Sequence, residues 1–273
     1  MNYNYFIPLI HFGPVHGSQF VQKLPLESIQ KLIVGKVAKF QIVRKVISDN
    51  KLILEKEEII EFLNNKWMNK EAAYFQWKSN IRKNQLCYIE THVNLLKGKG
   101  LLSSSMPGFY VNYLHQKRKN FISCGLDKYG NPRVILQMKE FGMWIDGYPG
   151  ININKENNTT YSLIIINPYK TQALMTLEIK NKKIAHSFKV SASSVKKIDL
   201  KEIIKQDFWT GQLYVYGKRR SLVYLVNHAI NNFVDISTIE HSDPFRAEYT
   251  YQPRFQFFRN LIHKKLKSIL KKK

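Results

Sequence analysis

The stretch from Cys87 to Leu95 alternates between two kinds of side chain. One set of positions holds Cys87, Ile89, Thr91, Val93 and Leu95, and the other holds Tyr88, Glu90, His92 and Asn94. Successive side chains of a β-strand point to opposite faces of its sheet, so this period of two predicts a strand with one buried and one polar face. A helix would instead space its apolar residues three or four apart. The segment therefore predicts β structure for the middle of the chain.

Short apolar segments continue along the chain after this strand. They cover about residues 109–114, 121–124, 133–138, 142–145, 161–166, 174–179, 185–198, 213–216 and 222–227. Turn signals such as Pro107-Gly108 and Asn167-Pro168 separate them. Short strands at this spacing predict an antiparallel sandwich or barrel over residues 86–245. The pattern leaves open whether this region is one sandwich or two that divide near residue 150.

Residues 1–85 have a different pattern and are expected to form a mixed, partly helical region. Between Leu52 and Ser79, apolar residues lie near helical spacing with glutamates between them, and Asp49 or Asn50 stands at a capping position. We expect a helical element over residues 52–78, packed on the β region or beside it. The expected fold is mainly β, with this N-terminal helical element and a C-terminal amphipathic helix.

Composition indicates a soluble protein of a reducing, cytoplasmic compartment. The 273 residues include 44% hydrophobic residues and only two cysteines, which is unlike a disulfide-built secreted scaffold. No secretory signal pattern opens the chain, and no apolar run approaches the roughly 18 residues of a membrane span. The formal net charge of +23 suits an anionic partner, or a surface whose solvated positions are lysines. The excess of Lys over Arg favours the second interpretation for most of the surface.

Motifs of the large enzyme families are absent from the sequence. It contains no P-loop, GxGxxG, HExxH, CxxC, GxSxG or EF-hand pattern, and no cofactor is indicated. We therefore expect a non-catalytic recognition or accessory protein, connected with glycan or cell-envelope chemistry at the inner face of a membrane.

The segment from Trp209 to Arg220 carries the strongest indication of a ligand site. Its candidate residues are Trp209, Gln212, Tyr214, Tyr216, Arg219 and Arg220. Gln212, Tyr214 and Tyr216 share one face of a predicted strand, and the two arginines occupy the adjoining turn. Exposed aromatic and amide groups make a platform for sugar rings or bases. The structural alternative is a buried layer of tyrosines with hydroxyls at its rim.

An enzyme is the competing hypothesis, and it rests on Glu90, His92 and His115. A Glu and a His two positions apart on one strand can direct their side chains at one metal ion or form an acid–base pair. His115 could join them from the next strand. The structural alternative is a solvated polar face of an antiparallel sheet.

Residues of about 160–243 resemble a known family of small β-sandwich proteins. An apolar strand leads to Asn167-Pro168 and Leu174-Met175-Thr176-Leu177. Then come Phe188-Lys189-Val190-Ser191-Ala192, Ile198-Asp199-Leu200 and a hairpin ending in Ser237-Thr238-Ile239. This order is similar to that of the sensory rhodopsin transducers. The resemblance covers under a third of the chain, and Trp209 to Tyr214 has no counterpart in it. It implies a non-catalytic interaction sandwich that can self-associate.

The C-terminal segment 246–273 predicts a basic amphipathic helix. From Arg254 onward every charged residue is basic. At helical spacing one half of the circumference collects Phe255, Phe258, Leu261, Ile262, Leu266, Ile269 and Leu270. Three interpretations stay open. The helix can dock on its own domain or on a second copy of the chain, lie on an anionic membrane surface, or bind nucleic acid. The last is the weakest because phosphate binding gives no reason for the apolar stripe.

Overall fold

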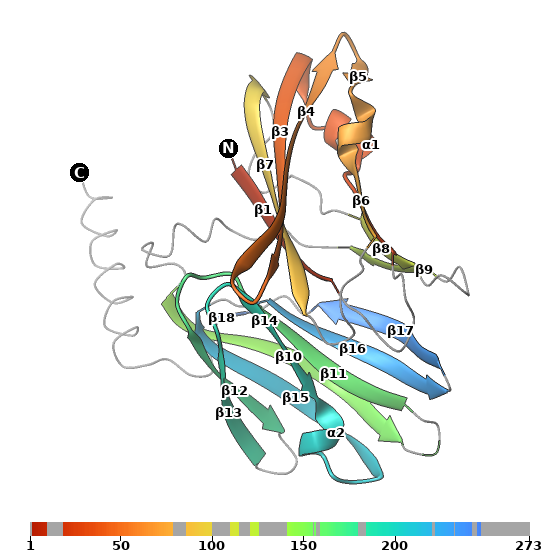
Figure 1. The fold of residues 1–273 in the computed structure, drawn as a ribbon, viewed down its shortest axis with the longest axis vertical. Coiled ribbons are helices and arrows are strands. Elements are labelled where there is room, and N and C mark those ends of the chain that lie inside the picture. The colour runs from red at the N-terminus through yellow and green to blue at the C-terminus, as the bar shows by residue number, and fades with distance from the viewer. Residues whose placement is uncertain are drawn as a thin grey trace, which may run out of the picture.

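The protein is built from antiparallel β-strands, as its alternating segments predict. The computed structural model describes residues 2–9, 19–78, 86–99, 110–114, 121–125, 141–154, 156, 159–179, 184–219, 222–231, 233–241 and 245–246. Every strand pair in these residues is antiparallel. The strands form two units, one above the other along the long axis of the molecule (Figure 1).

The first unit is a sandwich of two sheets. One sheet has the order β1 (Asn2–Leu9), β7 (Cys87–Lys99), β3 (Val34–Ser48), β4 (Lys51–Leu63) and β5 (Lys66–Met68). The other has the order β6 (Tyr74–Lys78), β2 (Gln19–Lys23), β8 (Tyr110–Leu114) and β9 (Phe121–Gly125). Helix α1 (Leu26–Gln30) and the 3₁₀ turn η1 (Lys70–Ala73) lie at one end. The odd-numbered residues of β7 from Cys87 to Val93 are buried in this sandwich, as the sequence predicts.

The prediction of a helical element over residues 52–78 is wrong, because most of this stretch is strand. Residues 51–63 form β4, which pairs with β3 along its whole length. Asp49 and Asn50, expected as a helix cap, have φ of 46° and 62°. Asn64 and Asn65, with φ of 49° and 64°, form the same kind of two-residue turn between β4 and β5. Asn and Asp accept positive φ more readily than other non-glycine residues, and two such residues in succession suit a tight β-hairpin.

The glutamates that suggested an exposed helical face instead form pairs across β3 and β4. Oε1 of Glu61 lies 2.6 Å from Nζ of Lys39, and Oε1 of Glu55 lies 2.9 Å from Nζ of Lys45. In each pair the two residues stand directly opposite in the register. Opposite charges facing each other across an antiparallel pair stabilise it, so the same charges that fit a helix surface fit this hairpin.

The second unit contains one continuous nine-stranded sheet among the described residues. Its strands are β10 (Phe141–Asn154), β11 (Thr159–Asn167), β12 (Ala173–Ile179), β13 (Ile184–Val190), β14 (Ser194–Asp199), β15 (Phe208–Arg219), β16 (Leu222–Asn231), β17 (Phe233–His241) and β18 (Phe245–Arg246). A short helix, α2 (Leu200–Ile203), follows β14. Among the described residues β10 and β11 pair only at Asn154 and Thr159. The sheet therefore folds there into two layers, β13-β12-β15-β10 and β14-β11-β16-β17, around a core of its own.

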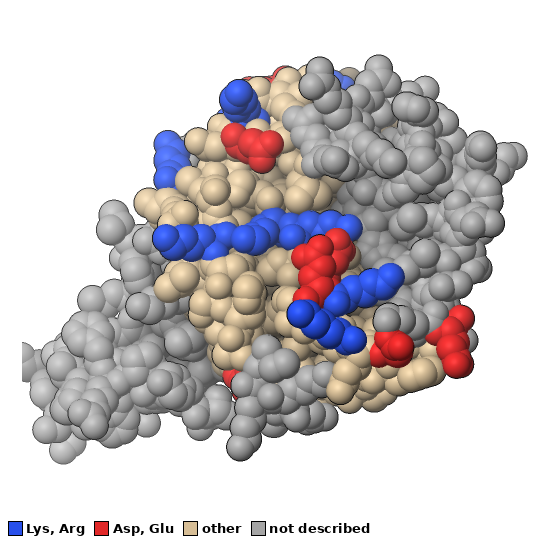
Figure 2. Space-filling view, turned by 60° about the horizontal axis from the view of Figure 1, so that its bottom comes forward, with Lys and Arg blue, Asp and Glu red and all other residues tan. Residues whose placement is uncertain are grey.

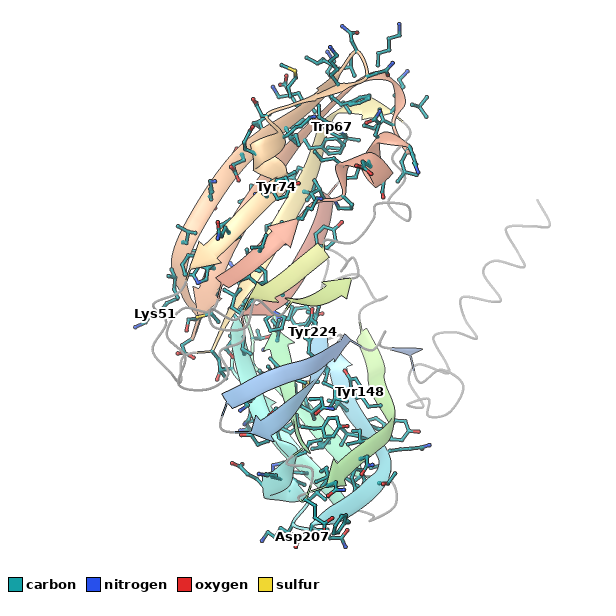
Figure 3. The ribbon with its side chains drawn as sticks, turned by 90° about the vertical axis from the view of Figure 1, so that its right-hand side faces the viewer. Lys51, Trp67, Tyr74, Tyr148, Asp207 and Tyr224 are labelled. Atoms are coloured by element: carbon teal, nitrogen blue, oxygen red, sulfur yellow. The ribbon has the colours of Figure 1, made fainter. Side chains whose placement is uncertain are left out.

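Strands β11 and β16 have apolar residues on both faces because they lie between two cores. Leu163 and Ile165 pack inside the second unit, whereas Ile164 and Ile166 pack with the first. Tyr224 of β16 lies between the units (Figure 3), and its hydroxyl donates to the Phe6 carbonyl at 2.7 Å. A strand that is buried on both faces has a continuous run of apolar residues in its sequence. This explains why apolar and polar residues do not alternate over residues 163–166.

The division between the two units lies between β9 and β10. Strand β7 pairs with β1 and β3, so a border at residue 85 would cut through one sheet. Strand β10 runs from Phe141 to Asn154, so a border near residue 150 would fall inside a strand. The units also touch at their turns, where the Asn50 N–H donates to the Ser193 carbonyl at 3.2 Å.

Candidate functional site: a tyrosine face on the second unit

Strand β15 separates its residues between the core and an outer face. Gly211, Leu213 and Val215 are buried, while Gln212, Tyr214 and Tyr216 are partly exposed. This is the shared face that the sequence predicts for the last three residues. We call these three residues, together with Glu178, Thr176 and Ser187 from the neighbouring strands, the tyrosine face.

Trp209 does not belong to the tyrosine face, and the expectation that its ring is partly exposed is wrong. It is only 6% exposed and packs in the core of the second unit. It lies an even number of residues from Leu213, so the two point to the same side of the strand. Arg219 ends β15, with its side chain outside the described part, and Arg220 lies outside the described residues.

The two tyrosine rings of this face lie next to each other. Their centroids are 6.3 Å apart, and their planes are inclined by 30°. The Tyr214 hydroxyl donates to Oε1 of Gln212 at 3.1 Å. On the other side, β10 places Gly147 directly opposite Tyr214. A Cβ at that glycine would lie 3.3 Å from Cε1 of the tyrosine, so the ring leans over the bare backbone of the neighbouring strand.

Strand β12 supplies the polar groups on the other side of the rings. Glu178 stands opposite Tyr214 in the register, and Thr176 stands opposite Tyr216. Partial burial raises the pKa of Tyr216 above its ordinary value of 10, and the hydrogen bond to Glu178 adds to the shift. The hydroxyls of Thr176 and Ser187 are 3.1 Å apart. Aromatic surface is thus bordered by a carboxylate, an amide and hydroxyls.

Sequence reasoning missed the partners that β12, β13 and β10 contribute. Glu178 and Thr176 alternate with buried Met175, Leu177 and Ile179, so their exposed face could be read from the pattern. Their place beside the tyrosines could not, because it depends on β12 pairing with β15, a strand more than thirty residues away in the sequence.

The acid–base candidates Glu90 and His92 are in contact on the outer face of β7. Nε2 of His92 and Oε1 of Glu90 are 2.6 Å apart, and both side chains are partly exposed. His115 lies outside the described residues. No group of three His, Cys, Asp or Glu side chains that could hold a metal occurs in the described part of the chain. The same face carries the Asn94–Gln41 hydrogen bond of 2.9 Å, so the pair belongs to a wider row of polar contacts.

Basic and acidic side chains are mixed on the face of the molecule shown in Figure 2. In the second unit, Nζ of Lys197 lies 3.0 Å from Oδ1 of Asp199. Much of the basic excess lies in sequence segments outside the described residues, among them residues 117–119, 180–183 and 264–273. The face in Figure 2 therefore gives no specific support to a nucleic-acid interface.

The seven apolar residues of the predicted tail helix, from Phe255 to Leu270, lie outside the described residues. Within the described ranges, the structure contains no helix with the length and apolarity of a membrane span.

Comparison with known proteins adds no assignment, since no family model and no curated protein matches this chain.

Proposed function

We propose that this protein is a non-catalytic recognition protein that binds a glycan through the tyrosine face. The observation that carries the proposal is the pair of adjacent, partly exposed rings of Tyr214 and Tyr216, bordered by Gln212 and Glu178. A flat aromatic surface stacks against the C–H groups of a sugar ring, and the polar tips of tyrosine bond its hydroxyls. Amide and carboxylate groups at the edge fix the orientation of such a ligand.

The carboxylate on this face favours an uncharged glycan over a nucleic acid. Glu178 lies across from Tyr214 in the adjacent strand. If a base stacked on the rings, its backbone phosphate would therefore lie near a like charge. A sugar hydroxyl, by contrast, can donate to that carboxylate, and such charge-assisted hydrogen bonds are the stronger kind. The face therefore suits neutral oligosaccharides better than single-stranded DNA or RNA.

Replacing Tyr214 or Tyr216 by alanine is expected to weaken glycan binding about tenfold, because tyrosines commonly dominate binding at such surfaces. A glycan array identifies ligands of the wild-type protein, and calorimetric titration then compares the variants. Phe208→Ala is the matched control, since Phe208 is 57% exposed and lies on the same side of the same strand, but at its start, six residues before Tyr214. The proposal fails if no glycan binds, or if Phe208→Ala loses as much affinity as the tyrosine variants.

We also propose that the basic tail holds the protein reversibly at an anionic membrane surface. The support is the sequence pattern, in which an apolar stripe faces a row of lysines between Arg254 and Lys273. Each lysine near an anionic leaflet adds roughly 1 kcal/mol of attraction.

The full chain is expected to sediment with vesicles containing phosphatidylserine and not with neutral ones, because lysine attraction requires anionic lipid. A chain ending at Gln252 is expected to stay folded and remain in the supernatant. If both chains ignore the anionic vesicles, and the truncation unfolds the protein or dissociates an oligomer, the tail is a packing element and the membrane proposal is wrong.

A further inference from the structure

Four neighbouring strands of the first unit carry exposed apolar side chains where they meet at one end of their sheet. Val34 begins β3, Leu63 ends β4, Met68 ends β5 and Leu96 lies near the end of β7. Their exposed fractions are 65%, 38%, 50% and 53%. A single exposed apolar residue is ordinary, but one from each of four adjacent strands indicates a surface that contacts a partner.

Strand pairing holds these positions together at the end of the sheet that lies away from the second unit. Val34 stands opposite Lys99 of β7, and Leu63 stands opposite Lys66 of β5. Figure 3 labels Trp67 of β5 at this end of the molecule. The opposite end of the sheet touches the second unit through the turn after β3. The apolar side chains therefore project away from the tyrosine face.

Lysines surround these apolar side chains. The segments 31–39, 63–70 and 95–99, which meet here, contain seven lysines and no Asp or Glu. Within the described part of the chain, only Lys39 of these seven pairs with a carboxylate, that of Glu61 at 2.6 Å. Glu71 borders the second segment, and the surface stays strongly basic. We call the following residues the basic tip: Val34, Leu63, Met68 and Leu96, with Lys36, Lys66, Lys97 and Lys99.

Charge and side-chain type decide which partner fits the basic tip. A second copy of the chain would place lysines against lysines, which repel. A nucleic acid would use the lysines, but the tip offers aliphatic side chains instead of the aromatic rings and arginines that stack on bases. An anionic membrane suits both components, because lysines attract its lipids and apolar side chains enter the boundary between headgroups and acyl chains.

We propose that the basic tip is a membrane-contact surface, whose apolar side chains insert into an anionic bilayer while its lysines lie among the lipid headgroups. The inference rests on the proposed attachment of the protein to an anionic membrane, and it names the part of the folded chain that shares this attachment with the tail. Two linked contacts bind more tightly than either contact alone, so the tip strengthens binding that the tail begins.

Sedimentation of the full chain with vesicles containing phosphatidylserine measures the contribution of the tip. The double change Met68→Gln with Leu96→Gln is expected to weaken partitioning about tenfold, because it removes apolar area that enters the bilayer. Lys66→Gln and Lys97→Gln are each expected to weaken it about fivefold. All four side chains are exposed, so these changes leave the core of the first unit intact.

The matched controls come from the opposite end of β4, where Lys51 lies close to the second unit (Figure 3). Leu52 is 55% exposed, like Leu96, and both Leu52→Gln and Lys51→Gln are expected to sediment like the wild type. Insertion is measured separately with brominated lipids, which quench an indole that enters the acyl region. The fluorescence of Met68→Trp is expected to be quenched by these vesicles, and the added indole of Leu52→Trp is not.

The inference is overturned if the tip variants sediment like the wild type, if the controls lose as much, or if Met68→Trp is quenched no more than Leu52→Trp. The chain ending at Gln252 separates the two membrane contacts. If this truncation abolishes sedimentation and the tip variants do not weaken it, the tail proposal stands and the tip inference fails. If the truncated chain still sediments and the tip changes release it, the tail proposal fails and the tip inference stands. A full chain that ignores anionic vesicles contradicts both.

Discussion

Replacing Arg44 by alanine is expected to lower the free energy of unfolding by about 3–5 kcal/mol, the usual cost of breaking a buried ion pair by removing one partner. Arg44 has no exposed surface and is the largest fully buried side chain among the described residues. It lies on β3, inside the first sandwich, where a charge is tolerated only if its donors are satisfied.

The guanidinium of Arg44 connects both sheets of that sandwich. It donates to Oε2 of Glu58 on β4 at 2.7 Å, to Oε1 of Gln22 on β2 at 3.0 Å and to the Ala72 carbonyl of η1 at 2.9 Å. It also lies 5.5 Å from the centre of the Phe75 ring. Burial lowers the pKa of Arg44 to about 10, against the opposing effect of Glu58, so the side chain stays charged at neutral pH. Its removal breaks all three hydrogen bonds between the sheets and η1, although Glu58 keeps its contact with Nζ of Lys56 at 2.8 Å and Gln22 keeps its contact with Thr91.

Urea unfolding of the Arg44→Ala and Lys45→Ala variants measures this effect. Lys45 is the next residue on the same strand and pairs with Glu55 at 2.9 Å, but this pair is exposed and is worth at most about 1 kcal/mol. Arg44→Met preserves much of the side-chain volume, so its loss of stability separates the broken polar contacts from the cavity. If Arg44→Ala costs no more than Lys45→Ala, the guanidinium does not hold the two sheets together.

Replacing Gly211 by alanine is expected to lower the free energy of unfolding by about 1–3 kcal/mol, the usual cost of overpacking a core. A Cβ at this position would come within 3.0 Å of Cζ2, Cε2 and Cη2 of the Trp209 ring. The indole is buried among apolar side chains, so it cannot swing into solvent without exposing the core. Either the ring or the strand must therefore shift.

A double-mutant cycle tests this contact directly. Trp209→Phe removes the part of the ring that the new methyl group would strike, so Gly211→Ala is expected to cost less in that background than in the wild type. Thr210→Ala, on the exposed side of the same strand, serves as the single-variant control. Equal costs of Gly211→Ala in both backgrounds would show that Trp209 does not pack over Gly211.

The alternation of apolar and polar residues predicted much of the fold, and its failures have physical causes. It identified β7 and the outer face of β15, where one side of the strand meets a core and the other meets solvent. It failed at β4, because glutamates placed for pairing with Lys39 and Lys45 also fit the exposed side of a helix. The pairs Asp49-Asn50 and Asn64-Asn65 held the decisive information, as two-residue hairpin turns.

The candidate site was predictable only within one strand. Gln212, Tyr214 and Tyr216 follow from the period of two, and the same rule places Trp209 with Leu213 in the core. The contributions of Glu178 and Gly147 come from sheet pairing between segments distant in sequence. Nothing local indicates which strand lies beside which, so the ring pair and Gln212 were foreseeable, but the groups that β12 and β10 place around them were not.

The central claim is that the tyrosine face binds a glycan, and amide chemical-shift mapping tests it most directly. The labelled full chain is titrated with the oligosaccharide that binds best on an array, and the shifted amides are assigned. We expect the shifts to cluster on β15 from Gln212 to Tyr216 and on β12 around Glu178, with few changes on β3 or β4. Saturable binding whose shifted amides lie away from β15 and β12, or the absence of any shift with every oligosaccharide tested, would contradict the claim.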